Sequence, residues 1–119
     1  MPTITPTVTY APEGHRNLAR VLWPAMSTGD VGAPVNLPSF PDCSVQVEGT
    51  FGGATVAMVG ADEATPANYR PLTDPQGNAI SMTAKGIEQI EEIASWIRPT
   101  VTGGAGSGLA VTLVARRAQ

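Results

Sequence analysis

Glycine and proline occur so often along this chain that few segments can form a long helix. The 119 residues include 13 glycines and 11 prolines, close to double the usual share of these two residues. Proline lacks a backbone donor and glycine lowers helix stability, so both favour turns between short strands. The length suits one domain. The sequence therefore predicts an all-β fold made of short strands.

The clearest strand is the alternation of apolar and polar residues from Cys43 to Phe51. A period of two indicates a strand with one buried face. Gly52 and Gly53 follow, and because both accept a positive φ we expect a tight hairpin there, with a return strand over 54–60. The residues expected on the buried face are Cys43, Val45, Val47, Gly49 and Phe51.

Further short strands are expected along the rest of the chain, separated by turn residues. Such strands at roughly 10-residue spacing are typical of a β-sandwich or jelly roll. Val31–Pro41, with three prolines, is expected to be an edge segment or an ordered loop, and Gly103–Gly108 a hairpin loop. The expected strands are Leu18–Ala25 ending at Pro24, Tyr69–Thr73, Ala79–Thr83, Ala94–Thr102 with a break at Pro99, and Leu109–Arg116.

Two segments depart from this pattern. In Lys85–Ile93, isoleucines recur every three residues, which predicts one short helix that covers an end of the sandwich. Residues 1–17 are rich in threonine and proline and are expected to form an extended N-terminal arm that lies either on its own domain or on a neighbour. The predicted fold is thus a single-domain β-sandwich or jelly roll over 18–119, with one short helix and the arm.

Few residues in the chain could carry chemistry, so no catalytic, cofactor-binding or metal site is predicted. His15 is the only histidine, and Cys43 is the only cysteine and alternates inward. A metal site needs three or four ligands. Glu88, Glu91 and Glu92 have the spacing of a solvated helix face. Gly103–Gly108 lacks the Gly-Lys-Ser/Thr ending of a phosphate-binding loop. We therefore expect the protein not to be an enzyme.

Charge and cysteine content narrow the possible partners. The net charge is -3, whereas nucleic-acid-binding domains carry a basic patch. No apolar run is long enough to span a membrane, and no signal peptide is visible. A single cysteine excludes an internal disulfide, which suits assembly in a reducing cytoplasm. Only 14% of the residues are charged, so much of the surface is free to be covered by partners.

Seven runs of this sequence form a recognisable pattern: Trp23–Ala25, Gly29–Asp30, Gly32–Pro34, Val45–Val56, Leu72–Ala79, Ile97–Gly104 and Leu109–Arg117. Together they resemble a family of small virion proteins of tailed bacteriophages, encoded near the major capsid protein. The similarity covers most of residues 19–117. One turn departs from the pattern, since such proteins tend to have Gly-Ser-Asn-Asp-Gly and a tryptophan where this chain has Gly60–Pro66.

Members of such families resemble capsid decoration, or cement, proteins with a jelly-roll fold. The resemblance implies a structural protein of the virion that binds the outer capsid surface and staples neighbouring major capsid subunits. It also implies self-association as a dimer or trimer and assembly in the host cytoplasm. We expect the arm and the proline-rich segment to contact the capsid or a second copy. The candidate contact residues are Ile4, Val8, Tyr10, Val31, Val35, Leu37 and Phe40.

Three other functions fit the same sequence. The chain could belong to another part of the virion, such as a tail tube, a connector or a fibre domain. It could be a carbohydrate-binding jelly roll, which would need an exposed aromatic platform. A small hydrolase on a β-scaffold would rest on His15 alone.

Overall fold

The computed structural model describes residues 3–11, 18–36, 40, 42–63, 68–92 and 94–116. Every regular element in these ranges is a strand, which confirms the predicted all-β class. The strands are β1 (Thr3–Ile4), β2 (Thr7–Ala11), β3 (Leu18–Met26), β4 (Val31–Gly32), β5 (Val35–Asn36), β6 (Asp42–Thr50), β7 (Thr55–Ala61), β8 (Arg70–Pro71), β9 (Ser81–Met82), β10 (Gly86–Ile90), β11 (Trp96–Thr102) and β12 (Ser107–Arg116).

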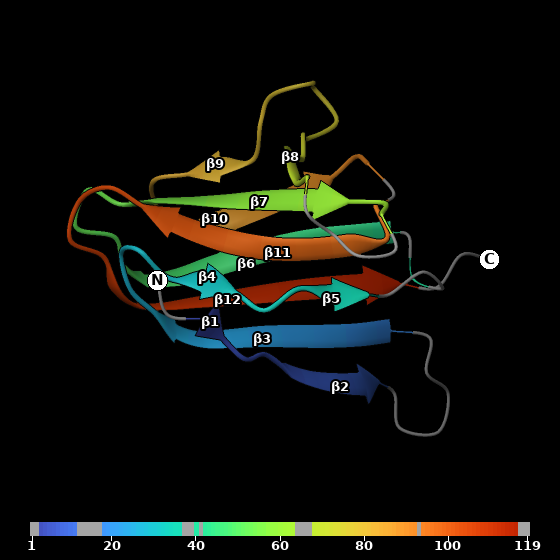
Figure 1. The fold of residues 1–119 in the computed structure, drawn as a ribbon, viewed down its shortest axis with the longest axis horizontal. Helices are drawn as coiled ribbons and strands as arrows, with labels where there is room; N and C mark the ends of the chain where they lie inside the picture. The colour runs from blue at the N-terminus through green and yellow to red at the C-terminus, as the bar shows by residue number, and fades with distance from the viewer. Residues whose placement is uncertain are drawn as a thin grey trace.

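The strands form two sheets that pack face to face as a sandwich (Figure 1). Sheet A has the order β1-β4-β11-β7-β8, with β5 also on β11 and β9 also on β7. Sheet B has the order β10-β6-β12-β3-β2. Its pairs are all antiparallel. In sequence, the chain moves repeatedly from one sheet to the other, as it does in a jelly roll.

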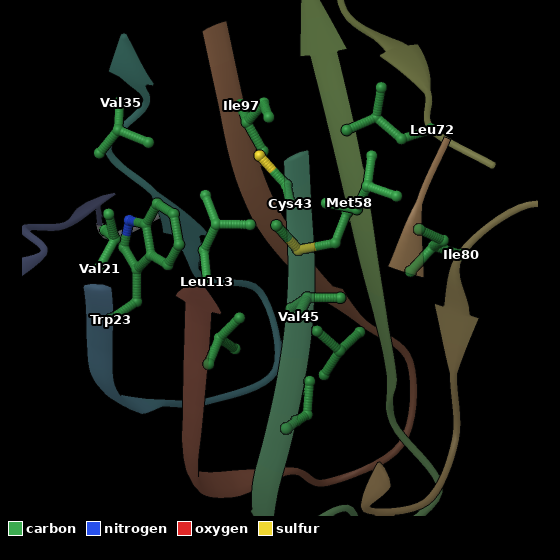
Figure 2. Packing of buried hydrophobic residues seen from close by; sticks show 14 of the residues in the cluster. Val21, Trp23, Val35, Cys43, Val45, Met58, Leu72, Ile80, Ile97 and Leu113 are labelled. Carbon is green, nitrogen blue, oxygen red and sulfur yellow. The ribbon is translucent and has the colours of Figure 1, made fainter. Parts of the chain in front are cut away.

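The core lies between the two sheets and is built by strict alternation along the long strands. Val45 and Val47 of β6, and Leu109, Val111 and Leu113 of β12, have no exposed surface. Figure 2 shows side chains from both sheets converging in this layer, with Met58 of β7 opposite the valines and leucines of sheet B. The polar residues between them face outward. The alternation confirms the period-two prediction from Cys43 to Val47 and from Leu109 to Ala115. Gly49, which was also expected on the buried face, is exposed because the register with β12 shifts there.

The predicted helix over Lys85–Ile93 is wrong, because this stretch contains the strand β10. Gly86–Ile90 pairs antiparallel with β6 along five residue pairs. In a strand, Ile87 and Ile90 point to opposite faces: Ile87 is 66% exposed, whereas Ile90 is buried. The isoleucines recur every three residues, as they would along one face of a helix. The segment instead forms a strand that pairs with β6. Ile93 lies outside the described residues.

The predicted hairpins at the glycine turns are also wrong, although the local turn chemistry is right. Gly52 and Gly53 have φ of 55° and 85°, and the amide of Ala54 donates to the Phe51 carbonyl at 2.8 Å. However, β6 belongs to sheet B and β7 to sheet A. The turn therefore joins the two sheets. The Gly103–Gly106 segment likewise joins β11 of sheet A to β12 of sheet B.

Two prolines that were expected to end or break strands lie inside them. Pro24 sits in a β-bulge of β3, where Pro24 and Ala25 oppose the single residue Ala110, and Ala25 has a φ of 49°. Bulges accept proline because the hydrogen-bond ladder is interrupted there. Pro99 lies where neither β4 nor β5 pairs with β11. Its ring packs on Gly32, where a Cβ atom would lie 2.5 Å from the proline Cδ.

Candidate functional site

Among the described residues, the interior of the sandwich is filled by side chains. The hollow beside Cys43 measures about 10 Å³, which is scarcely room for one water molecule. Trp23 is fully buried, and its indole Nε1 donates to the Ala33 carbonyl at 2.9 Å. Asp30 is the one buried charged residue among those described. Its carboxylate accepts the Ser27 amide at 2.8 Å, so it stabilises a turn.

The candidate chemical residues do not gather into a cluster. Burial raises the pKa of the Cys43 thiol to about 11, with a smaller contribution from the charge of Asp42. A thiol in that state is a poor nucleophile at neutral pH. No group of three or more histidine, cysteine or acidic side chains in the described ranges could hold a metal ion. His15 lies outside those ranges. In the same ranges there is no helix long and apolar enough to cross a membrane.

Two clefts on the surface are open to solvent. One of about 410 Å³ includes Asp62, Arg70 and Glu92 in its lining. Two of these groups bond within the chain, since Asp62 accepts the Ser95 amide at 2.8 Å and Glu92 accepts the Thr73 amide at 2.7 Å. The Thr73 hydroxyl also donates to Glu92, and these bonds lower the pKa of the Glu92 carboxyl. The acids therefore stabilise the fold and do not converge on a common point.

The second cleft, of about 400 Å³, lies on the outer face of sheet A beside Arg98 and Thr100. The Arg98 guanidinium carbon stacks 3.8 Å from the centre of the Tyr69 ring. Its Nε atom is buried and has no hydrogen-bond partner among the described residues. This cation–π pair was not predicted, because the two residues are far apart in sequence and neither stands in a motif.

The predicted contact residues fall into three groups. Val31, Val35 and Phe40 are buried in the protein's own fold, so their side chains support the sandwich. Ile4 is half-buried against the core. Val8 and Tyr10 are 38% and 41% exposed on β2. Leu37 lies outside the described residues.

The described part of the N-terminal segment, 3–11, is paired with strands of the same sandwich. This pairing explains why Ile4 is half-buried while Val8 and Tyr10 stay partly exposed. β1 runs parallel to β4 in sheet A, and β2 pairs with β3 in sheet B along five residue pairs. The segment therefore passes from β1, at an edge of sheet A, to β2, at an edge of sheet B. The Tyr10 ring lies 5.9 Å from the Phe40 ring, centre to centre.

The centre of the outer face of sheet B is almost uncharged, and charged side chains lie toward its ends, with Asp42 and Arg116 at one end and Glu48 at the other. The register places two rows of five side chains across all of its strands, on the face opposite the core. Arg20 is the one charged member of these two rows. Leu22 and Ile87 are 36% and 66% exposed in the first row, and the sequence pattern gave no signal for either. The rows are Ile87, Gln46, Thr112, Leu22, Thr7 and Gln89, Ser44, Val114, Arg20, Thr9.

Comparison with solved structures finds the same architecture in a phage protein. The SPBc2 prophage-derived protein YomS superimposes with a TM-score of 0.62 over 82% of this chain and 93% of that chain, at 13% identity. The chain shares the fold of a prophage-derived protein. A cupin domain from Bordetella pertussis Tohama I gives a TM-score of 0.49 over 97% of this chain and 95% of that chain, at 14% identity.

A cupin 2 domain-containing protein from Halorhodospira halophila gives a TM-score of 0.46 at 11% identity, over 96% of this chain and 65% of that chain. Neither a family model nor a curated protein matches the sequence. At the identity found with YomS, the likeness shows the jelly-roll sandwich alone. The features that bear on function are therefore those of this chain: a filled interior, the nearly uncharged centre of the outer face of sheet B, and the exposed strand β2.

Proposed function

We propose that this protein is a structural component of a phage particle that binds the outer surface of the capsid and joins neighbouring copies of the major capsid protein. The observation that carries the proposal is the centre of the outer face of sheet B, where two rows of side chains crossing five strands include one charge, Arg20. Depletion of charge is typical of the centre of a protein–protein interface.

Two further observations support the proposal. The sequence runs such as Val45–Val56 resemble virion proteins encoded beside the major capsid protein, and the fold is that of a prophage-derived protein. A decoration protein also needs no interior site, and here the interior is filled by apolar side chains. On a capsid, many copies of one modest contact act together through avidity.

The test is co-sedimentation of the purified protein with emptied, undecorated capsids of the same phage. The proposal expects saturable binding at a fixed ratio to the capsid protein. Protein that stays in the supernatant at every concentration would overturn it. The remaining functions would then be a tail tube, connector or fibre component, or a carbohydrate-binding domain, which tail preparations and a glycan array would test.

Thr112→Arg tests the contact face, because Thr112 lies at the centre of the first row and its side chain points away from the core. A charge there should weaken capsid binding on the order of tenfold or more, since a buried charge without a partner is costly. Thr102→Arg is the matched control, because Thr102 is exposed at the end of β11 in the other sheet. Equal binding by both variants would exclude this face.

Removing residues 1–17, which the sequence suggested as a test of the arm, is a poorer experiment. β1 and β2 both belong to the sheets, and their loss would uncover part of the core along with any contact. Point substitutions separate folding from binding, and a thermal unfolding curve of each variant checks that separation.

A further inference from the structure

Strand β2 forms one edge of sheet B. It pairs with β3 from Thr7 opposite Leu22 to Ala11 opposite Leu18, and no described strand lies on its other side. In Figure 1 it runs along the lower margin of the molecule. The outer side of an edge strand can template pairing with another chain, and proteins normally protect such edges by shortness, charge or bulges.

The other edges are protected along their length, whereas β2 is protected only at its ends, where Pro6 and Pro12 flank the strand. The outermost strands of sheet A, β1, β8 and β9, have two residues each. At the far edge of sheet B, β10 contains Glu88 and is flanked by Lys85 and Glu91. β2 has five residues, Thr-Val-Thr-Tyr-Ala, with no charge. Its pairing with β3 runs without a register shift.

The exposed apolar side chains of β2 lie on the face that continues the core. Val8 stands opposite Val21 and Tyr10 opposite Ala19, and both partners are fully buried residues of the core. Val8 and Tyr10 therefore extend the inner layer of sheet B past the part that sheet A covers. Covering them would remove further apolar area from water.

We propose that two copies of this chain associate by antiparallel pairing of their β2 strands about a two-fold axis at Thr9. Val8 of each copy then stands opposite Tyr10 of the other, on the core face, and Thr9 stands opposite Thr9 on the outer face. Pairs of an aromatic with a β-branched residue, and of two threonines, stabilise neighbouring strands. The result is one continuous ten-stranded sheet, formed by two five-stranded sheets, with the same patch used on both copies.

The sequence of β2 selects this register. An axis at Thr9 pairs all five residues of the strand with residues of the same strand in the second copy. An axis at Val8 would bring Tyr10 opposite Pro6, and one at Tyr10 would bring Val8 opposite Pro12. Proline cannot donate to the ladder. The strand has no charged residue, so the Thr9 register brings no like charges together.

The first experiment is sedimentation velocity of the full chain without capsids, over a range of concentrations. We expect a monomer–dimer equilibrium. Val8→Lys should raise the dimer dissociation constant by about tenfold or more, because a charge on an edge strand opposes pairing. Ile87→Lys adds the same charge to the opposite edge of the same sheet, at a side chain that is 66% exposed, and should leave the dimer unchanged.

The second experiment tests the register by cross-linking. Residues directly opposite in an antiparallel pair have Cα atoms about 4.5–5.5 Å apart, which is within the reach of a disulfide. Thr9→Cys should therefore give a covalent dimer under mild oxidation. In Thr7→Cys, the two new thiols would lie four residues apart along the ladder, roughly 13 Å, and should stay reduced. Cys43 is buried and does not compete.

A monomer at all concentrations would overturn the proposal, as would a dimer that Val8→Lys leaves intact. Cross-linking of Thr7→Cys as fast as Thr9→Cys would overturn the register. None of these measurements involves a capsid. Their failure is therefore distinct from failure of the proposed function, which is read from co-sedimentation and from the Thr112→Arg variant.

Discussion

The two ends of the sandwich are closed by different chemistry. At one end, three turns that connect the sheets meet: Ser27–Asp30, Phe51–Ala54 and Gly103–Gly106. They are joined mainly by backbone groups, such as the Ala105 amide donating to the Gly52 carbonyl at 2.9 Å. At the other end, the carboxylates of Asp62 and Glu92 accept backbone amides across the sequence. Added volume should therefore disrupt the first end, and loss of charge should disrupt the second.

Gly104→Ala gives the largest expected effect. A Cβ atom at Gly104 would lie 2.3 Å from the Gly53 carbonyl carbon, and the residue has a φ of 56°. The backbone of one turn must therefore move, and we expect a loss on the order of 3 kcal/mol in the free energy of unfolding. Urea unfolding measures it.

Gly103→Ala is the matched control for that loss. Gly103 stands in the same turn with a φ of 74°, but the nearest atom to its Cβ position is 3.9 Å away. This variant has the backbone strain without the collision, and should lose about 1 kcal/mol. Equal losses in both variants would mean that the close approach of the two turns does not matter.

Thr28→Val sharpens the comparison by removing one hydroxyl from the same end. That hydroxyl donates to the Gly103 carbonyl at 2.7 Å and accepts the Gly106 amide at 2.8 Å. Removing it should cost about 1–2 kcal/mol, because two hydrogen bonds are lost at a partly exposed site. Thr28→Ser keeps the hydroxyl and should stay close to the wild type in the same urea experiment.

This end also shows where prediction from sequence succeeded and failed. The turn at Gly52–Gly53 was predicted because it needs only two residues with positive φ. That the turn joins the two sheets depends on which strands pair within each sheet, for example β11 with β7 in sheet A and β12 with β6 in sheet B. A local motif holds no information about such long-range pairing.

Among the strands, too, some were predicted from the sequence and one was missed. β6 and β12 were predicted well because their apolar residues alternate without interruption. β10 was missed because the isoleucines at 87, 90 and 93 recur every three residues, which resembles the apolar stripe on one face of a helix. The sequence did not separate the exposed Val8 and Tyr10 from the buried Val35 and Phe40, because exposure of an apolar residue depends on how far the second sheet extends. Whether any of these residues contacts a partner stays a prediction.

Glu92→Gln tests the other end and should give a smaller effect. The carboxylate accepts the amide and the hydroxyl of Thr73, while the side chain is partly exposed. Solvent screening limits the value of such a contact, so we expect a loss of about 0.5–1 kcal/mol at neutral pH. Glu91→Gln changes the same net charge at an exposed neighbour and should have almost no effect on the urea midpoint.

The pH dependence of that loss is the smallest effect and the most specific one. The hydroxyl of Thr73 and then its amide lower the pKa of the Glu92 carboxyl in the folded protein. A lowered folded pKa means that the stabilisation is complete above the unfolded value and is lost as the pH falls through the folded value. The stability difference between wild type and Glu92→Gln should therefore persist at neutral pH and vanish on acidification. If the difference stays constant from neutral pH down into the acid range, the contact is not made by the charged carboxylate. The two ends would then differ in geometry alone.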